Sequence, residues 1–350
     1  MNRSGLPRPR SCHDTVRHGS HARAALRRTE TSASNYYHST PSMSGMPNTP
    51  CIPTQPTCDV ITITYNAAAF LQGYLDAITA VRGVTTVRIL DNASTDGTAA
   101  ILHRHSSGAS RVHVAQSENN LGFSRACNLV AASSSADILA FVNPDVFIHD
   151  PELLTDCINA LLEDHTRGVV GCSLVRLDGT LDHAARRGEP TLWNAACYFL
   201  GLASRFPSVQ LLNGYSPTEP PVSSVSEVDA VNGAFMICRR ADFMELGGFD
   251  EHFWMYGEDL DLCRRFRESG RRVIFKSDVS AVHLKGAANG GRRPPVAQRA
   301  FFESMAIYYV KHHPNARVRS WLISTLIQWR LHSLRLQPPS ATESTAIGSS

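Results

Sequence analysis

The sequence of 350 residues lacks the patterns of several common protein classes. No uninterrupted apolar run reaches 18 residues, and no short apolar core stands near the N-terminus, so we expect neither a membrane-spanning helix nor a signal peptide. Its nine cysteines include no CxxC pair and no Cys/His spacing of a zinc site. Reduced thiols in a cytoplasmic protein are therefore expected.

A concentrated positive charge is also missing from most of the chain. The first fifty residues hold seven arginines against one aspartate and one glutamate, a net charge of +5, so the remainder carries −2 of the total of +3. Binding to the phosphate backbone needs a concentrated cationic face. We therefore expect no nucleic acid among the ligands of this protein.

Residues 1–56 have no apolar periodicity, and residues 40–56 are rich in Pro, Ser and Thr. This composition predicts a disordered N-terminal tail, and residues 337–350 are expected to form a second one. The arginine-rich, acid-poor beginning also resembles an organellar transit peptide. A start codon assigned too early, with Met43 or Met46 as the true beginning, is a further interpretation.

Short apolar runs alternate with helix-sized segments after this tail. The runs cover residues 60–64, 87–90, 112–115 and 138–142, and the expected helices cover residues 70–80, 98–105 and 124–133. Apolar runs of this length are typical of buried parallel strands in a doubly wound α/β sheet. Shorter strands and more turns are expected from residue 169 to about residue 290.

Each of these four strands ends in a polar turn. The turns are Tyr65-Asn66, Asp91-Asn92, Glu118-Asn119-Asn120 and Asn143-Pro144-Asp145. Asn and Asp favour turns for local reasons, so one such turn carries little information. Because ligands bind beyond the carboxyl ends of the strands in such sheets, four polar turns on one edge favour a cleft for a polar ligand.

An acidic cluster follows Gly257, with carboxylates at Glu258, Asp259 and Asp261. One interpretation is an acidic first helical turn, stabilised by the helix dipole and paired with the arginines that follow at 264, 265 and 267. The other interpretation is a catalytic site, and the cluster alone does not decide between them.

Two residues are candidates for holding a divalent cation. Asp145 follows the fourth strand, where a carboxylate could bind magnesium or manganese together with phosphates, although a turn or a helix cap is the plainer interpretation. His283 ends an expected strand over residues 275–283 and could supply a nitrogen to the same cation.

The C-terminal part, residues 293–336, is expected to form amphipathic helices. Aromatic and apolar residues recur at helical spacing from residue 301, and a second helix is expected over residues 318–334. Its Trp, Leu and Arg residues suit peripheral contact with the inner face of the plasma membrane and suit docking onto the main domain equally well.

Over residues 59–290 the sequence resembles the family 2 glycosyltransferases, most closely the bacterial rhamnosyltransferase-like branch. Eight motifs occur in the order of that family: TYN at 64–66, DNASTDGT at 91–98, NNLGFSRACN at 119–128, NPD at 143–145, GA at 233–234, GFDE at 248–251, EDLDLC at 258–263, and His283 followed by Gly286. The resemblance implies a GT-A fold, a doubly wound and mostly parallel sheet flanked by helices, over residues 57–292.

The resemblance also implies a role for each matching residue. A nucleotide-sugar site would be lined by Thr64, Tyr65, Asn66, Asp91, Asn92, Ser94, Gly122, Phe123 and Asn143. Asp145 would hold the cation with His283 as a further ligand. Asp259 would be the general base that takes the proton from the acceptor hydroxyl, and Glu258 and Asp261 would orient it or contact the substrate. Asn143 replaces the first Asp of the family's DxD motif, so the cation would have one charged ligand fewer.

The function implied by this resemblance is inverting transfer of L-rhamnose from dTDP-rhamnose onto a cell-envelope glycan or a lipid-linked acceptor. A UDP-hexose-dependent glycosyltransferase is an alternative. A nucleotidyltransferase is a third, although no glycine-rich loop with a lysine follows the first strand. A non-catalytic sugar-nucleotide-binding relative is the fourth, and it would be expected to lack the acidic cluster.

Overall fold

The computed structural model describes residues 55–106, 111–190, 223–284 and 295–315, together with residues 205, 323, 325 and 327. Both expected tails, and nearly all of the expected helix 318–334, lie outside the described residues, as does Gly286. Within the described ranges, no helix is long and apolar enough to cross a membrane. The domain boundaries stay a prediction.

The described elements alternate between strands and helices. The strands are β1 (Cys58–Thr64), β2 (Thr86–Asp91), β3 (Val112–Gln116), β4 (Ile138–Val142), β5 (Val146–Phe147), β6 (Arg167–Val175), β7 (Arg186–Arg187), β8 (Val225–Glu227), β9 (Ala230–Val231), β10 (Phe235–Arg239) and β11 (Arg272–His283). The helices are α1 (Ala68–Ala80), α2 (Thr98–His105), α3 (Phe123–Ala132), α4 (Leu153–Leu162), η1 (His183–Ala185, a 3₁₀ turn), α8 (Arg240–Glu245), α9 (Glu258–Glu268) and α10 (Pro295–His312).

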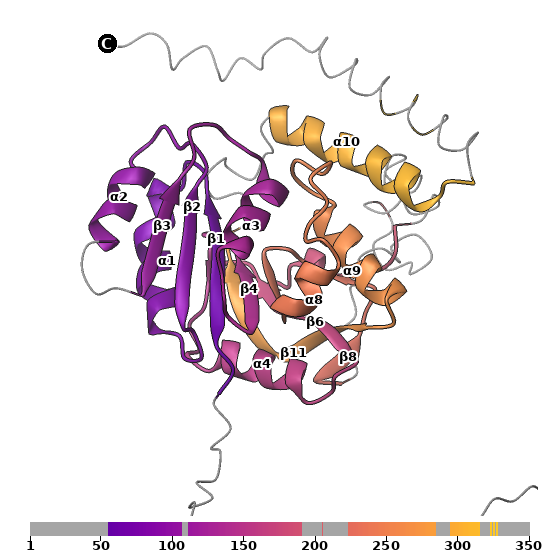
Figure 1. Ribbon diagram of the computed structural model, residues 1–350, viewed down its shortest axis with the longest axis horizontal. Coiled ribbons are helices and arrows are strands. Elements are labelled where there is room, and N and C mark those ends of the chain that lie inside the picture. The colour runs from indigo at the N-terminus through magenta and orange to yellow at the C-terminus, as the bar shows by residue number, and fades with distance from the viewer. Residues whose placement is uncertain are drawn as a thin grey trace, which may run out of the picture. The chain divides into compact units, whose positions relative to one another are not determined.

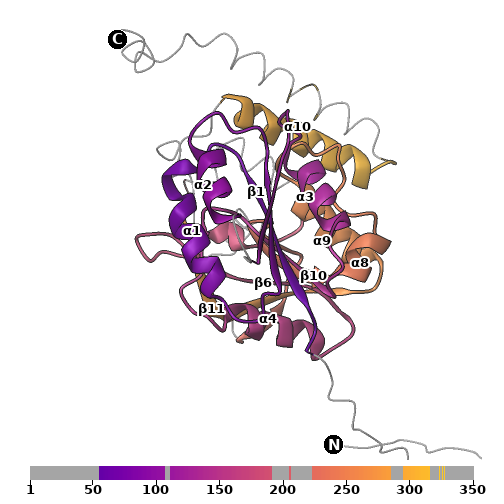
Figure 2. The same cartoon turned by 60° about the vertical axis from the view of Figure 1, so that its left-hand side comes forward.

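The N-terminal half forms the parallel part of the sheet, in the order β3-β2-β1-β4. Every residue of β1 and β4 is buried, because helices cover both faces. Figure 2 shows α1 and α2 on one side of these strands and α3 on the other. The four predicted strands and three predicted helices are confirmed, with ends that differ by at most two residues.

The C-terminal half extends the sheet with mixed pairing. β10 runs antiparallel to both β4 and β6, and β6 pairs in parallel with β11. The expectation of shorter strands in this half holds for β7, β8 and β9, which have 2 or 3 residues, but not for β6 and β11, which have 9 and 12. The pairing of β11 shifts register between Lys276 and Ser280, so one strand continues through an irregularity that interrupts its apolar pattern.

Three features of this fold assemble the ends of the strands into a site. The register of β1 and β2 sets Thr64 beside Asp91, and the pairing of β5 with β11 sets His283 beside Val146. Figure 1 shows α10 above α9, and Lys311 near the C-terminal end of α10 contacts Asp261 in the first turn of α9.

Candidate active site

Asp91 is the last residue of β2 and is buried beside a polar hollow that Ser94 helps to line. Its carboxylate is 1% exposed, and Oδ1 accepts hydrogen bonds from the hydroxyls of Thr64, at 3.3 Å, and Ser94. The other oxygen, Oδ2, is buried and has no hydrogen-bond partner in the structure. Since buried carboxylate oxygens are almost always hydrogen-bonded, Oδ2 is suited to accept a hydrogen bond from a ligand N–H group.

Two turns beside Asp91 are tied together by Asn66. Its backbone N–H donates to Ser94 Oγ at 2.9 Å, and its Oδ1 accepts from the Thr95 N–H at 2.8 Å. Asn66 has a φ of 49°, a left-handed conformation that asparagine tolerates better than most residues. The neighbouring Tyr65 is 51% exposed. A hollow of about 400 Å³ is lined by Ala93, Ser94, Thr95, Gln116, Ser117 and Glu118.

Asn92 holds the loop in front of α3. Its Oδ1 accepts from the Leu121 N–H at 2.8 Å, and its Nδ2 donates to Asn120 Oδ1 at 3.0 Å. The side chain of Asn92 is 3% exposed, so it shapes the wall of the hollow through this loop.

The same loop docks onto the segment that leads into α9. Gly122 has a φ of +80°, and a Cβ atom there would lie 2.4 Å from the Trp254 ring. The Phe123 N–H donates to the Trp254 carbonyl at 2.7 Å. This contact joins the polar hollow to the acidic cluster, and nothing in the spacing of the sequence indicated Trp254 as its partner.

Asp145 and His283, the two predicted cation ligands, face each other. The distance from His283 Nε2 to Asp145 Oδ2 is 3.4 Å, and His283 Nδ1 lies 3.2 Å from Asp182 Oδ2. Burial lowers the pKa of His283, but hydrogen bonds to Asp145 and Asp182 and the charges of both carboxylates outweigh burial and raise the pKa to about 9. Asn143 lies nearby with a half-buried side chain, and its backbone N–H donates to the Ala234 carbonyl at 2.9 Å.

Asp182 was missed as a site residue, because only the folded chain brings it to His283. Across the ranges that the structure describes, no group of three or more His, Cys, Asp or Glu side chains could hold a metal by itself.

All three carboxylates of the acidic cluster are buried in the first turn of α9, after Gly257 with a φ of +82°. Glu258 and Asp259 are 6% exposed and Asp261 is fully buried. This burial excludes a purely solvated helix start. The expected pairing with the following arginines holds for Arg265, whose Nε lies 2.8 Å from Asp261 Oδ2, while Arg264 and Arg267 pair with Glu189 instead.

Asp259 is held by donors from three segments. Its Oδ2 accepts from the Gly233 N–H at 2.8 Å and from the Arg187 guanidinium, and its Oδ1 accepts from the Leu260 N–H at 2.8 Å. Gly233 allows this approach, since a Cβ atom there would lie 3.2 Å from the Asp259 side chain. Arg187 was not among the predicted site residues.

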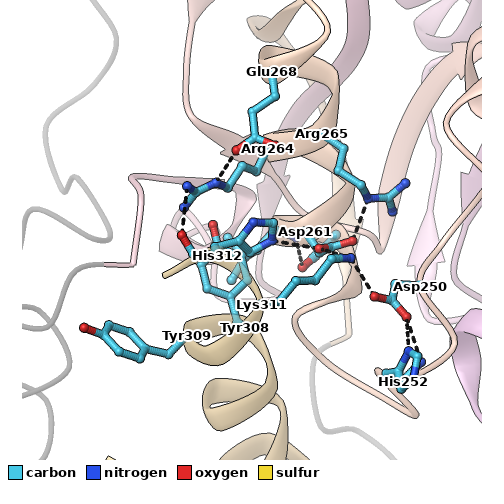
Figure 3. Close-up of polar contacts among 12 residues, drawn as sticks. Asp250, His252, Asp261, Arg264, Arg265, Glu268, Tyr308, Tyr309, Lys311 and His312 are labelled. Carbon is cyan, nitrogen blue, oxygen red and sulfur yellow. Dashed lines mark hydrogen bonds and ion pairs between the residues drawn. The ribbon is translucent and has the colours of Figure 1, made fainter. Parts of the chain in front are cut away.

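Asp261 joins α9 to α10 (Figure 3). Its Oδ1 lies 2.7 Å from Lys311 Nζ and 2.8 Å from His312 Nε2, and Lys311 also contacts Asp250 at 2.6 Å. The contacts of this carboxylate are with other protein groups, so the structure gives it a role in orienting helices. Contact of Asp261 with substrate stays a prediction.

Comparison with known proteins identifies the family. The sequence model described as glycosyl transferase family 2 matches residues 59–216, and one described as the N-terminal domain of galactosyltransferase matches residues 213–283. The chain is 28% identical over 276 residues to the N-acetylglucosaminyl-diphospho-decaprenol L-rhamnosyltransferase of Mycobacterium tuberculosis, covering 73% of this chain and 84% of that protein. Residues 59–216 of this chain form a glycosyltransferase family 2 domain.

One further relative and two solved structures are also similar to this glycosyltransferase. It is 27% identical to the rhamnosyltransferase WbbL of Escherichia coli K12 over 178 residues, which cover 50% of this chain and 59% of WbbL. A solved mannosyltransferase from Pyrobaculum calidifontis matches 85% of this chain and 77% of its own, with a TM-score of 0.50 and 18% identity. The chain also covers 65% of a solved Staphylococcus aureus TarS chain, with a TM-score of 0.48. The fold of this glycosyltransferase is GT-A, as predicted.

Glu258 of this glycosyltransferase gives a test of the buried cluster through pH. Burial, and then the charge of Asp259, raise the pKa of Glu258 above its ordinary value of 4.5. As pH rises above 4.5 the unfolded chain loses this proton before the folded protein does, so Glu258 lowers stability progressively. Because glutamine stays neutral, we expect the melting temperature of Glu258→Gln relative to wild type to be higher at pH 8 than at pH 5, measured by circular dichroism.

The control for this measurement is Glu268→Gln, which changes an exposed carboxylate on the same helix. Its melting temperature relative to wild type should show no such rise with pH. A difference for Glu258→Gln that stays constant between pH 5 and 8 would mean that Glu258 is ionised in the folded protein.

Proposed function

We propose that this glycosyltransferase moves L-rhamnose from dTDP-rhamnose onto a cell-envelope glycan or a lipid-linked acceptor, with inversion at the anomeric carbon. Two relatives named as rhamnosyltransferases support the donor sugar, and the name of one specifies a diphospho-decaprenol acceptor. Peripheral contact with the inner face of the plasma membrane would suit such an acceptor. The observation that carries the proposal is the carboxylate of Asp259, buried and oriented in the first turn of α9.

The donor would bind at the hollow beside Asp91. The free Oδ2 of Asp91 matches the N–H group of a pyrimidine base, and Asn66 and Ser94 hold the two turns that border it. A neutral base N–H bound to a buried carboxylate forms a charge-assisted hydrogen bond. Thr64 and Asn92 support this wall from behind, while Tyr65, Gly122, Phe123 and Asn143 stay proposed donor contacts.

Asp259 would act as the general base. It would accept the proton of the acceptor hydroxyl while the acceptor oxygen bonds to the anomeric carbon on the face opposite the leaving diphosphate. One in-line displacement of this kind inverts the configuration without a covalent intermediate. General base catalysis contributes about 10²- to 10⁴-fold to such a reaction.

The contacts of Asp145 and His283 fit a divalent cation, magnesium or manganese. With its pKa raised to about 9, His283 carries protons on both ring nitrogens near neutral pH, Nδ1 toward Asp182 and Nε2 toward Asp145, so a cation would have to replace the Nε2 proton. Magnesium and manganese are often held by one or two protein ligands together with substrate phosphates and water. Such a cation would neutralise the charge that develops on the departing diphosphate. The mannosyltransferase from Pyrobaculum calidifontis was solved with GDP-Man and Mn²⁺.

Asp182→Asn tests this cation site without removing a ligand. An asparagine amide can donate to His283 Nδ1 and thereby favour the tautomer that carries its proton on Nε2, where the cation would bind. We expect the Mn²⁺ concentration for half-maximal activity to rise by roughly 10- to 100-fold, measured by titrating metal into the chelated enzyme.

Asp178→Asn is the matched control, because Asp178 lies on the same segment and pairs with Thr180 in an exposed turn. It should leave the metal requirement as in wild type. An unchanged metal requirement in Asp182→Asn would remove Asp182 from the cation site.

A donor panel tests the function itself. The purified full chain would be mixed with dTDP-rhamnose, UDP-galactose, UDP-GlcNAc or GDP-mannose and a polyprenyl-diphospho-GlcNAc acceptor, with and without Mn²⁺. We expect nucleoside diphosphate release with dTDP-rhamnose, and NMR of the product should show the inverted anomer. Absence of turnover and of binding with every donor would reject the transferase proposal.

A UDP-hexose donor is the second candidate, because the sequence model over residues 213–283 is described as a galactosyltransferase domain. Release of UDP in place of dTDP in the same panel would favour it. Incorporation of a nucleoside monophosphate with release of pyrophosphate would indicate a nucleotidyltransferase, and donor binding without turnover would indicate a non-catalytic relative.

A further inference from the structure

Arg187 reaches the proposed base from a distant part of the chain. It lies on β7, 72 residues before Asp259, and its guanidinium contacts Asp259 Oδ2. The two side chains are buried together, with 10% and 8% of their surfaces exposed. An arginine buried against a carboxylate at a proposed reaction centre acts directly on the charge and orientation of that carboxylate.

The backbone around Arg187 restricts where its guanidinium can lie. Nη2 donates to the Val231 carbonyl at 2.8 Å as well as to Asp259. Val231 belongs to β9, which pairs with β7 through Arg186. Arg187 is therefore held by a two-stranded ribbon whose strand β9 packs against α9, and it reaches Asp259 from a strand outside that helix.

The donors divide unequally between the two oxygens of Asp259. Oδ2 accepts from Arg187 and from the Gly233 N–H, whereas Oδ1 accepts from the N–H of Leu260 at 2.8 Å. A carboxylate oxygen has about two lone-pair sites, so the two donors at Oδ2 occupy it. Oδ1 keeps capacity to receive a proton.

We propose that Arg187 is a positioning residue for this reaction: it engages Oδ2 of Asp259 and presents Oδ1 to the acceptor hydroxyl. The proton of that hydroxyl moves to Oδ1 as the acceptor oxygen bonds to the anomeric carbon. The bond from that carbon to the diphosphate oxygen breaks, and the diphosphate leaves with the electron pair. The proposal rests on the proposed role of Asp259 as base.

The charge around Asp259 explains why it needs such a partner. Glu258 and Asp261 stand beside it in the first turn of α9, and Cys263 lies one turn further on. The guanidinium of Arg187 brings a positive charge into contact with Oδ2 of Asp259, and a neighbouring cation favours the ionised form of a carboxyl group. Loss of the guanidinium should therefore make Asp259 harder to ionise.

The test is the pH dependence of kcat/KM in Arg187→Met, with the donor and acceptor that the wild type uses. The base works only when ionised, so activity falls at pH values below its pKa. We expect the acidic limb of the profile to move upward by about 1 to 3 pH units in Arg187→Met, and by less in Arg187→Lys, which keeps the charge. The affinity for dTDP should stay as in wild type.

Arg186→Met is the control, because Arg186 is the neighbouring buried arginine, with its guanidinium 5.8 Å from the centre of the Phe275 ring. Its acidic limb should stay in place. A limb that is unmoved in Arg187→Met, with activity lowered equally at every pH, would show a merely structural role and overturn the proposal.

Two further outcomes are distinguishable. If Arg187→Met does not fold, Arg187→Lys decides alone: a limb displaced upward supports the proposal, and an unmoved limb overturns it. Absence of turnover in the wild type with every donor would reject the proposed function itself. This outcome is seen without any variant, so it is distinct from a failure of the proposal on Arg187.

Discussion

Asp259→Asn is expected to lower turnover by roughly 10²- to 10⁴-fold, the range for losing a general base. An amide cannot take the acceptor proton, but it keeps one oxygen, which can accept from the Gly233 N–H and Arg187, and it keeps nearly the same shape. The donor site at Asp91 lies on another element, so we expect the affinity for dTDP to stay close to wild type. Single-turnover rates and calorimetric titration with dTDP would measure the two quantities.

The variant also leaves the buried guanidinium of Arg187 without its carboxylate, so its fold must be checked by near-UV circular dichroism. Glu268→Gln, an exposed change on the same helix, should keep full turnover. Equal turnover in Asp259→Asn and wild type would exclude Asp259 as the base.

Asp261→Ala is expected to have the largest effect on stability, a loss of about 3 to 5 kcal/mol in the free energy of unfolding. Asp261 is fully buried and pairs with Arg265, Lys311 and His312, so its removal leaves these groups without their shared carboxylate. The contacts between α9 and α10 would weaken first. Urea unfolding followed by circular dichroism would measure the loss.

Asp250→Asn is the matched control, because Asp250 contacts Lys311 from the other side and is partly exposed. The loss in the free energy of unfolding should be clearly smaller for Asp250→Asn than for Asp261→Ala. Asp261→Asn separates charge from packing, since it keeps the volume of the side chain. A loss below about 1 kcal/mol in Asp261→Ala would mean that this cluster does not hold α10 in place.

The stability difference should also depend on pH. Burial raises the pKa of Asp261, but hydrogen bonds from His312 and Lys311 and the charges around it outweigh burial and hold the pKa below its ordinary value of 3.8. A carboxylate whose pKa is lower in the folded protein than in the unfolded chain stabilises the fold fully at pH values above its unfolded-state pKa. This stabilisation is lost as pH falls through its folded-state pKa. The difference in the free energy of unfolding between wild type and Asp261→Asn should therefore become smaller below about pH 4.

The parallel half of the fold could be predicted because its signal is local. β1 and β4 are continuous apolar runs, and burial on both faces requires such runs. β11 was harder to delimit, because Lys276 and Asp278 interrupt its apolar pattern where its register shifts. The position of a β-bulge cannot be predicted from the pattern of apolar and polar residues alone.

The residues of the candidate site also fall into those that the sequence predicted and those that only the structure revealed. Asp91 and Asp259 were predicted from motifs whose residue types carry the chemistry. Asp182, Arg187 and Trp254 were not, because each acts through a partner more than 70 residues away, and neither spacing nor composition encodes such a contact.

The acidic segment after Gly257 shows what each level decided. The sequence by itself placed three carboxylates after Gly257, left a helix start and a catalytic site as two interpretations, and surrounded them with motifs that resemble those of family 2 glycosyltransferases. Only the tertiary structure decided their separate environments: Glu258 buried, Asp259 held by Arg187 and Gly233, and Asp261 paired across to α10. The physical reason is that the ionisation and orientation of a carboxylate depend on burial and on the charges within a few ångströms, and the folded chain supplies these from distant segments.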